Sequence, residues 1–281
     1  MLYKEIAHGK ENQLAYVRTN EWKDEVVLFF HGFCGSKEYF PDFEYDDNTC
    51  IVSFDRPGVG GSSVEENYSM EDFLMNVHSV LMSHHVSSVR VIGHSAGGYY
   101  AQVFAQMYPD DVKSLSLVSS MIALNCPMTK GLVKGQWKFI TLLSLRFKRL
   151  TRFYFKKMAS GITKGYERHL ASNMKTLLPF EKQFIEENHD MIKKAVLNAV
   201  ANDGAGICHD AHALCQKREG LSISKDIPVY IWHGAEDTTT SLSFIEYFKS
   251  EYCVKEVHII ENAGHMLYLP YWKEIIEEAI G

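Results

Sequence analysis

Two kinds of apolar periodicity alternate along the chain. Short runs rich in β-branched and aromatic residues, bounded by glycine, proline or acidic residues, predict buried strands. These runs lie at residues 25–30, 49–54, 89–92, 112–119, 227–233 and 256–260. Segments with apolar residues every three or four positions predict helices at residues 70–84 and 96–107. Strands that alternate with helices predict an α/β fold, with a mostly parallel central sheet flanked by helices.

Local signals add detail to the N-terminal third of the chain. Apolar and polar residues alternate over residues 2–18, which predicts two antiparallel edge strands joined by a turn at residues 8–12. The first helix has its own start signal, because Ser69 can cap it and Asp72 follows three positions later.

The alternation of strands and helices stops between residues 122 and 222. This segment is predicted to be mostly helical, with glycines as breaks. Residues 1–121 and 223–281 are therefore predicted to form one core domain, and residues 122–222 a helical insertion. A chain of 281 residues is long enough to bury such a core.

Composition and charge narrow the class of protein. Hydrophobic residues make up 46% and charged residues 23% of the chain, and no apolar run approaches the ~20 residues of a membrane-spanning helix. The formal net charge of −6 disfavours a general nucleic-acid binder. Six scattered cysteines suit reduced thiols, and the N-terminus has no basic region followed by an apolar core. We therefore expect a cytoplasmic protein.

One stretch departs strongly from this acidic average. Residues 130–168 contain eleven basic residues and a single acidic one, Glu167. The basic residues are Lys130, Lys134, Lys138, Arg146, Lys148, Arg149, Arg152, Lys156, Lys157, Lys164 and Arg168. Aromatic and aliphatic side chains lie between them, a composition found in segments that contact a membrane surface or an anionic ligand. The alternative is a helix whose apolar face packs inward and whose cations are only solvated.

Residues 93–97 carry the strongest chemical signal. They read Gly-His-Ser-Ala-Gly, between a predicted strand and a predicted helix. In a G-x-S-x-G sequence at such a junction, a sharp turn exposes the serine hydroxyl above the sheet edge, and the small flanking residues permit the turn. The dipole and the free N–H groups of the helix N-terminus favour negative charge on an attacked acyl group. Ser95 is therefore predicted to be a nucleophile.

Three further patterns follow predicted strands. They are a His-Gly turn at residues 31–32, a Gly-x-x-Asp pattern at residues 234–237 and a Gly-His pair at residues 264–265. With the serine turn, they make the chain resemble the serine-dependent α/β hydrolases of the capped branch, which holds esterases, thioesterases and carbon–carbon bond hydrolases. The resemblance covers residues 25–121 and 226–280.

The resemblance implies a role for each motif. Ser95, Asp237 and His265 are expected to form a catalytic triad, in the chain order that this fold requires. His265 is expected to take the serine proton, and Asp237 to orient the imidazole. The backbone N–H groups of Phe33 and Ala96 are expected to form the oxyanion hole.

The acid, the lid and the substrate are further expectations from this resemblance. Glu236 is adjacent to Asp237 and is an alternative acid. The insertion at residues 122–222 is expected to form a lid, and the chemistry needs no metal or organic cofactor. The expected substrate is a small-molecule ester or thioester, because an acyl-serine is its direct product. The alternatives are a carbon–carbon bond hydrolase and a ligand-binding receptor or regulator with slow turnover.

Two other motifs invite different functions. The glycine-rich loop at residues 55–63 lacks the spacing of G-x-G-x-x-G, and it resembles instead the Asp-x-x-Gly-x-Gly-x-Ser loop of α/β hydrolases. Cysteine, histidine and aspartate gather at residues 208–215, but their spacing fits no common zinc pattern. Dehalogenases and epoxide hydrolases of this fold use an aspartate nucleophile, which Ser95 disfavours. The sequence thus predicts no nucleotide, metal or nucleic-acid partner.

Overall fold

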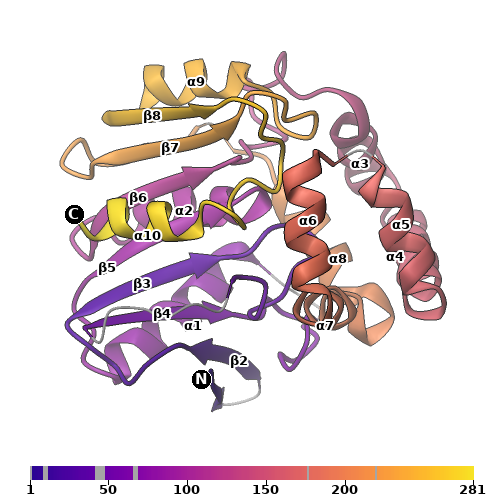
Figure 1. The fold of residues 1–281 in the computed structure, drawn as a ribbon, viewed down its shortest axis with the longest axis horizontal. Helices are drawn as coiled ribbons and strands as arrows, with labels where there is room; N and C mark the ends of the chain where they lie inside the picture. The colour runs from indigo at the N-terminus through magenta and orange to yellow at the C-terminus, as the bar shows by residue number, and fades with distance from the viewer. Residues whose placement is uncertain (1, 9–11, 42–47, 66–68, 176, 219) are drawn as a thin grey trace.

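The computed structural model describes residues 2–8, 12–41, 48–65, 69–175, 177–218 and 220–281. Within these residues, eight strands form one sheet (Figure 1). The strands are β1 Tyr3–His8, β2 Gln13–Arg18, β3 Glu25–Phe30, β4 Thr49–Phe54, β5 Val89–His94, β6 Val112–Val118, β7 Val229–Gly234 and β8 Val254–Ile260. Their spatial order is β1-β2-β4-β3-β5-β6-β7-β8. β2 pairs antiparallel with β1 and β4, and the other neighbours are parallel.

The predicted strands and the α/β class are confirmed, with small shifts at strand ends. β7 begins at Val229 rather than at residue 227, because Pro228 has no N–H to donate to a neighbouring strand. β8 begins at Val254, two residues before its predicted start. The predicted N-terminal hairpin is present, since β1 and β2 pair along their whole length. The turn predicted at residues 8–12 lies mostly outside the described residues.

Helices cover both faces of the sheet and enclose two cores. These helices are α1 Met70–Ser83, α2 Ala96–Met107, α9 Ser243–Glu251 and α10 Trp272–Ile280. The first three contribute to one core, and α10 contributes to the other. Along β3, Leu28 belongs to the first core and Phe29 to the second, as expected for side chains that alternate between faces. The central strands are nearly fully buried because both faces are covered.

Both predicted core helices are confirmed. α1 begins after Ser69, whose hydroxyl oxygen accepts a hydrogen bond from the Asp72 N–H at 3.0 Å. α2 spans the predicted residues 96–107 and begins directly after Ser95. That start places Ser95 at a helix N-terminus and at the carboxyl end of β5.

Within the described part of the chain, six helices lie between β6 and β7. They are α3 Gly135–Arg146, α4 Lys148–Lys164, α5 Tyr166–Met174, α6 Pro179–Glu187, α7 His189–Ala199 and α8 Ala201–Leu214. They gather at the end of the sheet toward which the parallel strands run (Figure 1). α8 starts irregularly, since Asn202, Asp203 and Gly204 have positive φ angles. The prediction that this segment is mostly helical is therefore confirmed.

Candidate active site

A strained turn between β5 and α2 holds Ser95. Its backbone angles, φ 54° and ψ −122°, lie in a region that residues with a side chain rarely adopt. The flanking glycines are required by space. A Cβ on Gly97 would lie 2.0 Å from the carbonyl oxygen of Phe30, and one on Gly93 would lie 2.5 Å from Gly98 Cα. The tightness of the turn thus explains the G-x-S-x-G spacing.

The structure brings together Ser95, Asp237 and His265, which are far apart in the sequence. Nε2 of His265 lies 2.9 Å from the Ser95 hydroxyl oxygen, and Nδ1 lies 2.9 Å from Oδ2 of Asp237. The three residues follow β5, β7 and β8, which run parallel and end at the same edge of the sheet. This geometry allows a serine hydroxyl to pass its proton to an imidazole.

Asp237, and not Glu236, contacts the histidine. The Asp237 side chain is fully buried, and its Oδ1 accepts hydrogen bonds from the N–H groups of Thr239 and Thr240 at 2.7 and 3.0 Å. Its Oδ2 accepts the Thr240 hydroxyl at 2.6 Å. Burial raises the pKa of Asp237, but the charge of His265 and these hydrogen bonds outweigh burial and hold the pKa well below its usual range. Glu236 is exposed to solvent.

His94, which precedes Ser95 in the turn, supports the loop that carries His265. Its Nε2 donates to the carbonyl oxygen of His265 at 3.0 Å, and its ring stacks on Tyr268 with 4.1 Å between centroids. Burial, together with the nearby His265, lowers the pKa of His94 to about 3. The ring is therefore neutral near pH 7, and it holds this carbonyl group without adding charge beside the site.

A carboxylate from the insertion holds the same loop. Glu181 in α6 is buried, and its two oxygens accept the Met266 N–H at 2.8 Å and the Leu178 N–H at 3.0 Å. Because Met266 follows His265 in the chain, α6 fixes the backbone next to the imidazole. The sequence reasoning missed Glu181. The available signal was Pro179 at a helix start with an acid two positions later.

The backbone groups expected to form the oxyanion hole lie close to the serine. A Cβ on Gly32 would lie 3.3 Å from Ser95 Cβ, so the chain just before Phe33 runs beside the serine. Ala96 follows Ser95 directly and begins α2. Within the described residues, neither the Phe33 N–H nor the Ala96 N–H has a hydrogen-bond partner. Two backbone donors are thus free near the serine.

Aromatic side chains of the insertion pack on this loop. The Phe33 ring meets Trp137 of α3 at 5.6 Å and Phe155 of α4 at 5.8 Å between centroids, both in edge-on geometry. Trp137 and Phe155 are buried, whereas Phe33 is partly exposed. The inward sides of α3 and α4 therefore cover the turn beside Ser95.

A buried ion pair ties the insertion to the residues before Phe33. Arg56 Nε lies 2.8 Å from Oδ1 of Asp210 in α8, and both side chains are buried. The other guanidinium nitrogens donate to the carbonyl oxygens of His31 and Gly32 at 2.8 and 2.9 Å. A buried charge must be fully hydrogen-bonded to be tolerated. Here the same hydrogen bonds fix the turn that leads to Phe33.

The sequence reasoning missed this pair. Asp210 lies in the segment 208–215, and the local sequence indicates for it only the residue types of a metal site. Its carboxylate is held instead by Arg56 and by the Tyr100 hydroxyl, which donates at 3.0 Å. Arg56 and Asp210 are 154 positions apart, so no local pattern connects them.

Other features lie apart from these residues. In the described chain, one group of side chains has the types and spacing of metal ligands: Glu256, His258 and Glu278. Glu278 already accepts hydrogen bonds from His258 at 2.6 Å and from the Trp232 indole at 2.6 Å. All six cysteines are free thiols. Among the described helices, none is long and apolar enough to cross a membrane.

Comparison with known proteins gives the family. A sequence model of the alpha/beta hydrolase fold matches residues 25–270. The chain belongs to the α/β-hydrolase fold family. It is a hydrolase of this fold, and the resemblance inferred from its motifs is confirmed.

Three relatives show how far the sequence likeness of this α/β hydrolase extends. It is 24% identical over 260 residues to an uncharacterized hydrolase, YcgS, of Bacillus subtilis (strain 168), which covers 88% of this chain and 87% of the relative. It is 30% identical over 121 residues to Lipase 1 of Psychrobacter immobilis, covering 42% of this chain and 38% of the lipase. It is 34% identical over 114 residues to a poly(3-hydroxyalkanoate) depolymerase of Ectopseudomonas oleovorans, covering 40% of each protein. The chain thus matches only about two fifths of the length of the last two.

Solved structures agree on the fold. A hydrolase from Pseudomonas aeruginosa PA01 superposes with a TM-score of 0.66 at 15% identity, covering 99% of this chain and 98% of that one. The enol-lactonase from Burkholderia xenovorans LB400 superposes with a TM-score of 0.68 at 12% identity, covering 98% of both chains. At such identities, the likeness shows that this α/β hydrolase shares their fold.

Proposed function

We propose that this α/β hydrolase is a serine hydrolase that cleaves a carboxylic ester or thioester of a small or acyl-chain substrate. The observation that carries the proposal is the continuous hydrogen-bonded series from Ser95 through His265 to the buried Asp237. In this series the hydroxyl has a base within reach, and the base has an anion that orients it. These are the requirements for nucleophilic catalysis by serine.

The reaction has two halves, which share one base. First, the Ser95 hydroxyl oxygen attacks the acyl carbon while Nε2 of His265 takes its proton. The bond to the leaving alcohol or thiol then breaks, and His265 gives that proton to the leaving group. Next, water attacks the acyl-serine, His265 takes one proton from the water, and the proton returns to Ser95 as the carboxylic acid leaves. Asp237 keeps Nδ1 protonated and stabilises the imidazolium.

The oxyanion of each tetrahedral intermediate is proposed to bind the N–H groups of Phe33 and Ala96. Both donors are free within the described chain and lie near Ser95. The N-terminus of α2 adds a favourable field for negative charge. A single donor of this kind contributes about 10²–10³-fold to kcat.

Residues 122–222 are proposed to form a cap over the site, on a core made by the rest of the chain. Contacts with both sides of the site support this role. Trp137 and Phe155 pack on Phe33, and Glu181 holds the backbone that follows His265. The cap is therefore proposed to shape the substrate pocket as well as to support the catalytic loops.

Some of the relatives support ester chemistry, while others are named for carbamate or epoxide hydrolysis. The relatives that support ester chemistry are a lipase and a poly(3-hydroxyalkanoate) depolymerase. Reactions that need an aspartate nucleophile are disfavoured, because a serine stands at the turn between β5 and α2.

The test combines p-nitrophenyl esters of increasing acyl length with a fluorophosphonate probe. The wild-type protein should turn over at least one ester repeatedly, and the probe should label Ser95. Ser95→Ala should lose labelling and turnover, whereas Ser79→Ala, at an exposed serine of α1, should keep both. Labelling that persists in Ser95→Ala would overturn the assignment. A burst of product equal to the enzyme concentration, without further turnover, would identify a slow receptor or regulator instead.

A further inference from the structure

The outward sides of α3 and α4 carry large apolar and basic side chains together. We propose that this surface docks the protein onto an anionic lipid membrane. We call it the α3–α4 outer face, and its apolar residues are Phe139, Leu142, Leu145, Phe147, Leu150 and Phe153. The proposal concerns binding, and it does not depend on which ester the enzyme cleaves.

The apolar residues of the α3–α4 outer face are unusually exposed. Each of the six is between 47% and 57% accessible, and all lie within residues 139–153. Single exposed hydrophobic residues are ordinary on protein surfaces. A contiguous group of them marks an interaction site or a surface prone to association.

These side chains are additional to the ones that hold the helices in place. α4 buries Thr151 and Phe155 on its inward side, and Phe153 lies two positions from each. With about 3.6 residues per turn, two positions lead to the opposite side of a helix. On α3, Leu142 likewise lies opposite the side that buries Ile140. The outer face is therefore a second apolar side, which the fold does not cover.

The two helices form one continuous surface. The rings of Phe139 on α3 and Tyr154 on α4 meet edge-on, with 6.1 Å between centroids. Nζ of Lys157 lies 5.6 Å from the centroid of the Phe153 ring, so a cation sits directly beside an exposed aromatic residue. α3 and α4 lie at the end of the molecule away from the sheet (Figure 1).

The basic residues of the outer face, which lie between residues 138 and 157, lack acidic neighbours in the sequence. No acidic residue occurs from residue 130 to residue 166. Among the described residues, Lys156 pairs with Asp203 at 2.7 Å, and both side chains are exposed. The other cations between residues 138 and 157 form no ion pair with a described residue. Since the whole chain is acidic, this concentration of free cations is a local feature.

An anionic membrane satisfies both components of this surface. Apolar side chains enter the boundary between headgroups and acyl chains, while lysine and arginine extend their charged ends to the phosphates. A second copy of the chain that docked through this same face would bring cations against cations, which is unfavourable. The charge and the interleaved aromatic residues therefore favour lipid over self-association.

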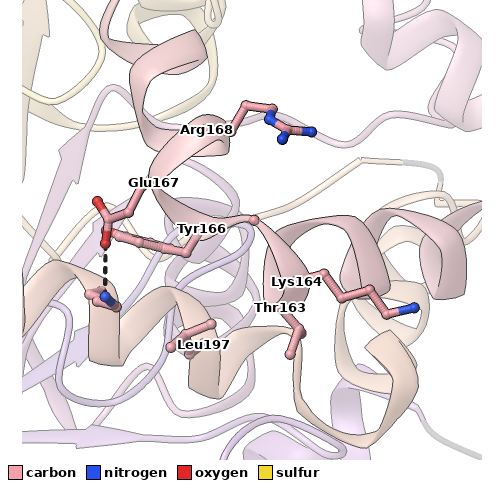
Figure 2. A pocket seen from close by; sticks show the side chains of 8 residues that line it. Thr163, Lys164, Tyr166, Glu167, Arg168 and Leu197 are labelled. Atoms are coloured by element: carbon pink, nitrogen blue, oxygen red, sulfur yellow. Dashed lines mark hydrogen bonds and ion pairs between the residues drawn. The ribbon is translucent and has the colours of Figure 1, made fainter.

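The outer face ends before the junction of α4 and α5. There, a hollow of about 530 Å³ is lined by residues 163–168, Lys193 and Leu197 (Figure 2). Within it, Glu167 pairs with Lys193 at 2.8 Å. Because an acid neutralises part of this region and the large exposed apolar residues of α3 and α4 stop at Tyr154, the hollow is not part of the docking surface.

Vesicle sedimentation with the full-length chain tests the charge component. The protein should sediment with vesicles of equal parts phosphatidylglycerol and phosphatidylcholine, should bind pure phosphatidylcholine much less, and should be released by salt. Arg149→Gln/Lys157→Gln should weaken binding by about tenfold or more, since each cation near an anionic surface contributes substantially. The control Lys255→Gln/Lys273→Gln removes the same charge from exposed residues of β8 and α10 and should bind like wild type. Equal loss in both variants, or no binding by the wild type, would overturn the proposal.

A second variant tests the apolar component. Leu142→Gln/Phe153→Gln should reduce vesicle binding and keep the turnover of a short water-soluble ester, because both side chains lie on the side away from Phe33. Sedimentation velocity on the same proteins identifies the competing occupant. A dimer that this variant dissociates, with vesicle binding unchanged, would assign the outer face to self-association. Binding of an acidic protein in place of vesicles would also contradict the lipid proposal.

Discussion

The inward and outward sides of α3 and α4 carry similar types of residue in different roles. On the inward side, Trp137 and Phe155 are buried against Phe33, beside the serine. On the outward side, Phe139 and Phe153 are more than half exposed among cations. The stretch is aromatic and basic throughout, so composition does not distinguish the sides. Position on the helix does, because it decides whether an aromatic ring stabilises the fold or remains available to a partner.

The largest expected effect is on the chemistry that the inward side covers. Asp237→Asn should lower kcat by about 10³–10⁴-fold, because an amide does not hold the imidazole in the required tautomer. Glu236→Gln is the matched control, and it should change kcat little, since Glu236 is exposed. Steady-state kinetics on one p-nitrophenyl ester measures both. The reverse result would move the role of the acid to Glu236.

The next prediction compares the stability contributed by a buried ion pair with that contributed by an exposed one. Arg56→Met should destabilise the protein by about 3–5 kcal/mol, because it leaves the Asp210 carboxylate buried without its partner. Lys156→Met breaks the exposed pair with Asp203 and should cost about 0–1 kcal/mol. Urea denaturation measures both free energies of unfolding.

A double variant separates the structural role of Arg56 from its role at the site. Arg56→Met/Asp210→Leu leaves no buried charge at this pair of positions, so it should recover much of the lost stability. It should not recover kcat, because the carbonyl groups of His31 and Gly32 still lack the hydrogen bonds that Arg56 donates. Full recovery of kcat would show that the pair stabilises the fold without positioning the loop.

A pair of phenylalanines two positions apart tests the comparison directly. Phe155→Ala should cost about 3–5 kcal/mol of stability, as is usual for a fully buried ring. Phe153→Ala should stay within about 0.5 kcal/mol of wild type, because its ring is exposed. Thermal or urea denaturation checks the difference. Equal losses would mean that the outer face contributes to the fold.

The smallest expected effect concerns pH. Burial lowers the pKa of folded His94 to about 3, whereas the unfolded residue titrates near its usual ~6.5. Between these values the unfolded state binds more protons, so the free energy of unfolding should fall as pH falls below about 6.5. His94→Gln keeps an N–H donor and removes this titration. It should reduce the slope by at most about 1.4 kcal/mol per pH unit.

His189 in α7 supplies the control for this titration. Hydrogen bonds to Glu167 and Asp190 raise its pKa, so its contribution to stability is present below its unfolded pKa and is lost as pH rises through its folded value. This sign is opposite to that of His94. His189→Gln should therefore not flatten the loss of stability between pH 7 and pH 5, as measured by urea denaturation.

The parts of the fold and site that could be predicted are those with local signals. Two glycines, which steric contacts require, predict the turn at Ser95. A serine and an aspartate at a fixed spacing predict the start of α1. Glu181 and the Arg56–Asp210 pair were missed, because their partners lie far away in the sequence. The basic stretch was recognised, but only the structure shows that its apolar residues divide between two sides of each helix.

The backbone of Ser95 also bears on how this enzyme can change over generations. A side chain at φ 54° costs roughly 1–3 kcal/mol, whereas glycine adopts such angles freely and loses roughly 0.5–1 kcal/mol through its more flexible unfolded chain. Ser95→Gly is therefore expected to unfold at a higher temperature than the wild type. A selection for heat resistance alone would discard the proposed nucleophile. Only a selection for product formation keeps a serine at this position. Directed evolution of this protein must therefore screen for turnover and thermal stability together.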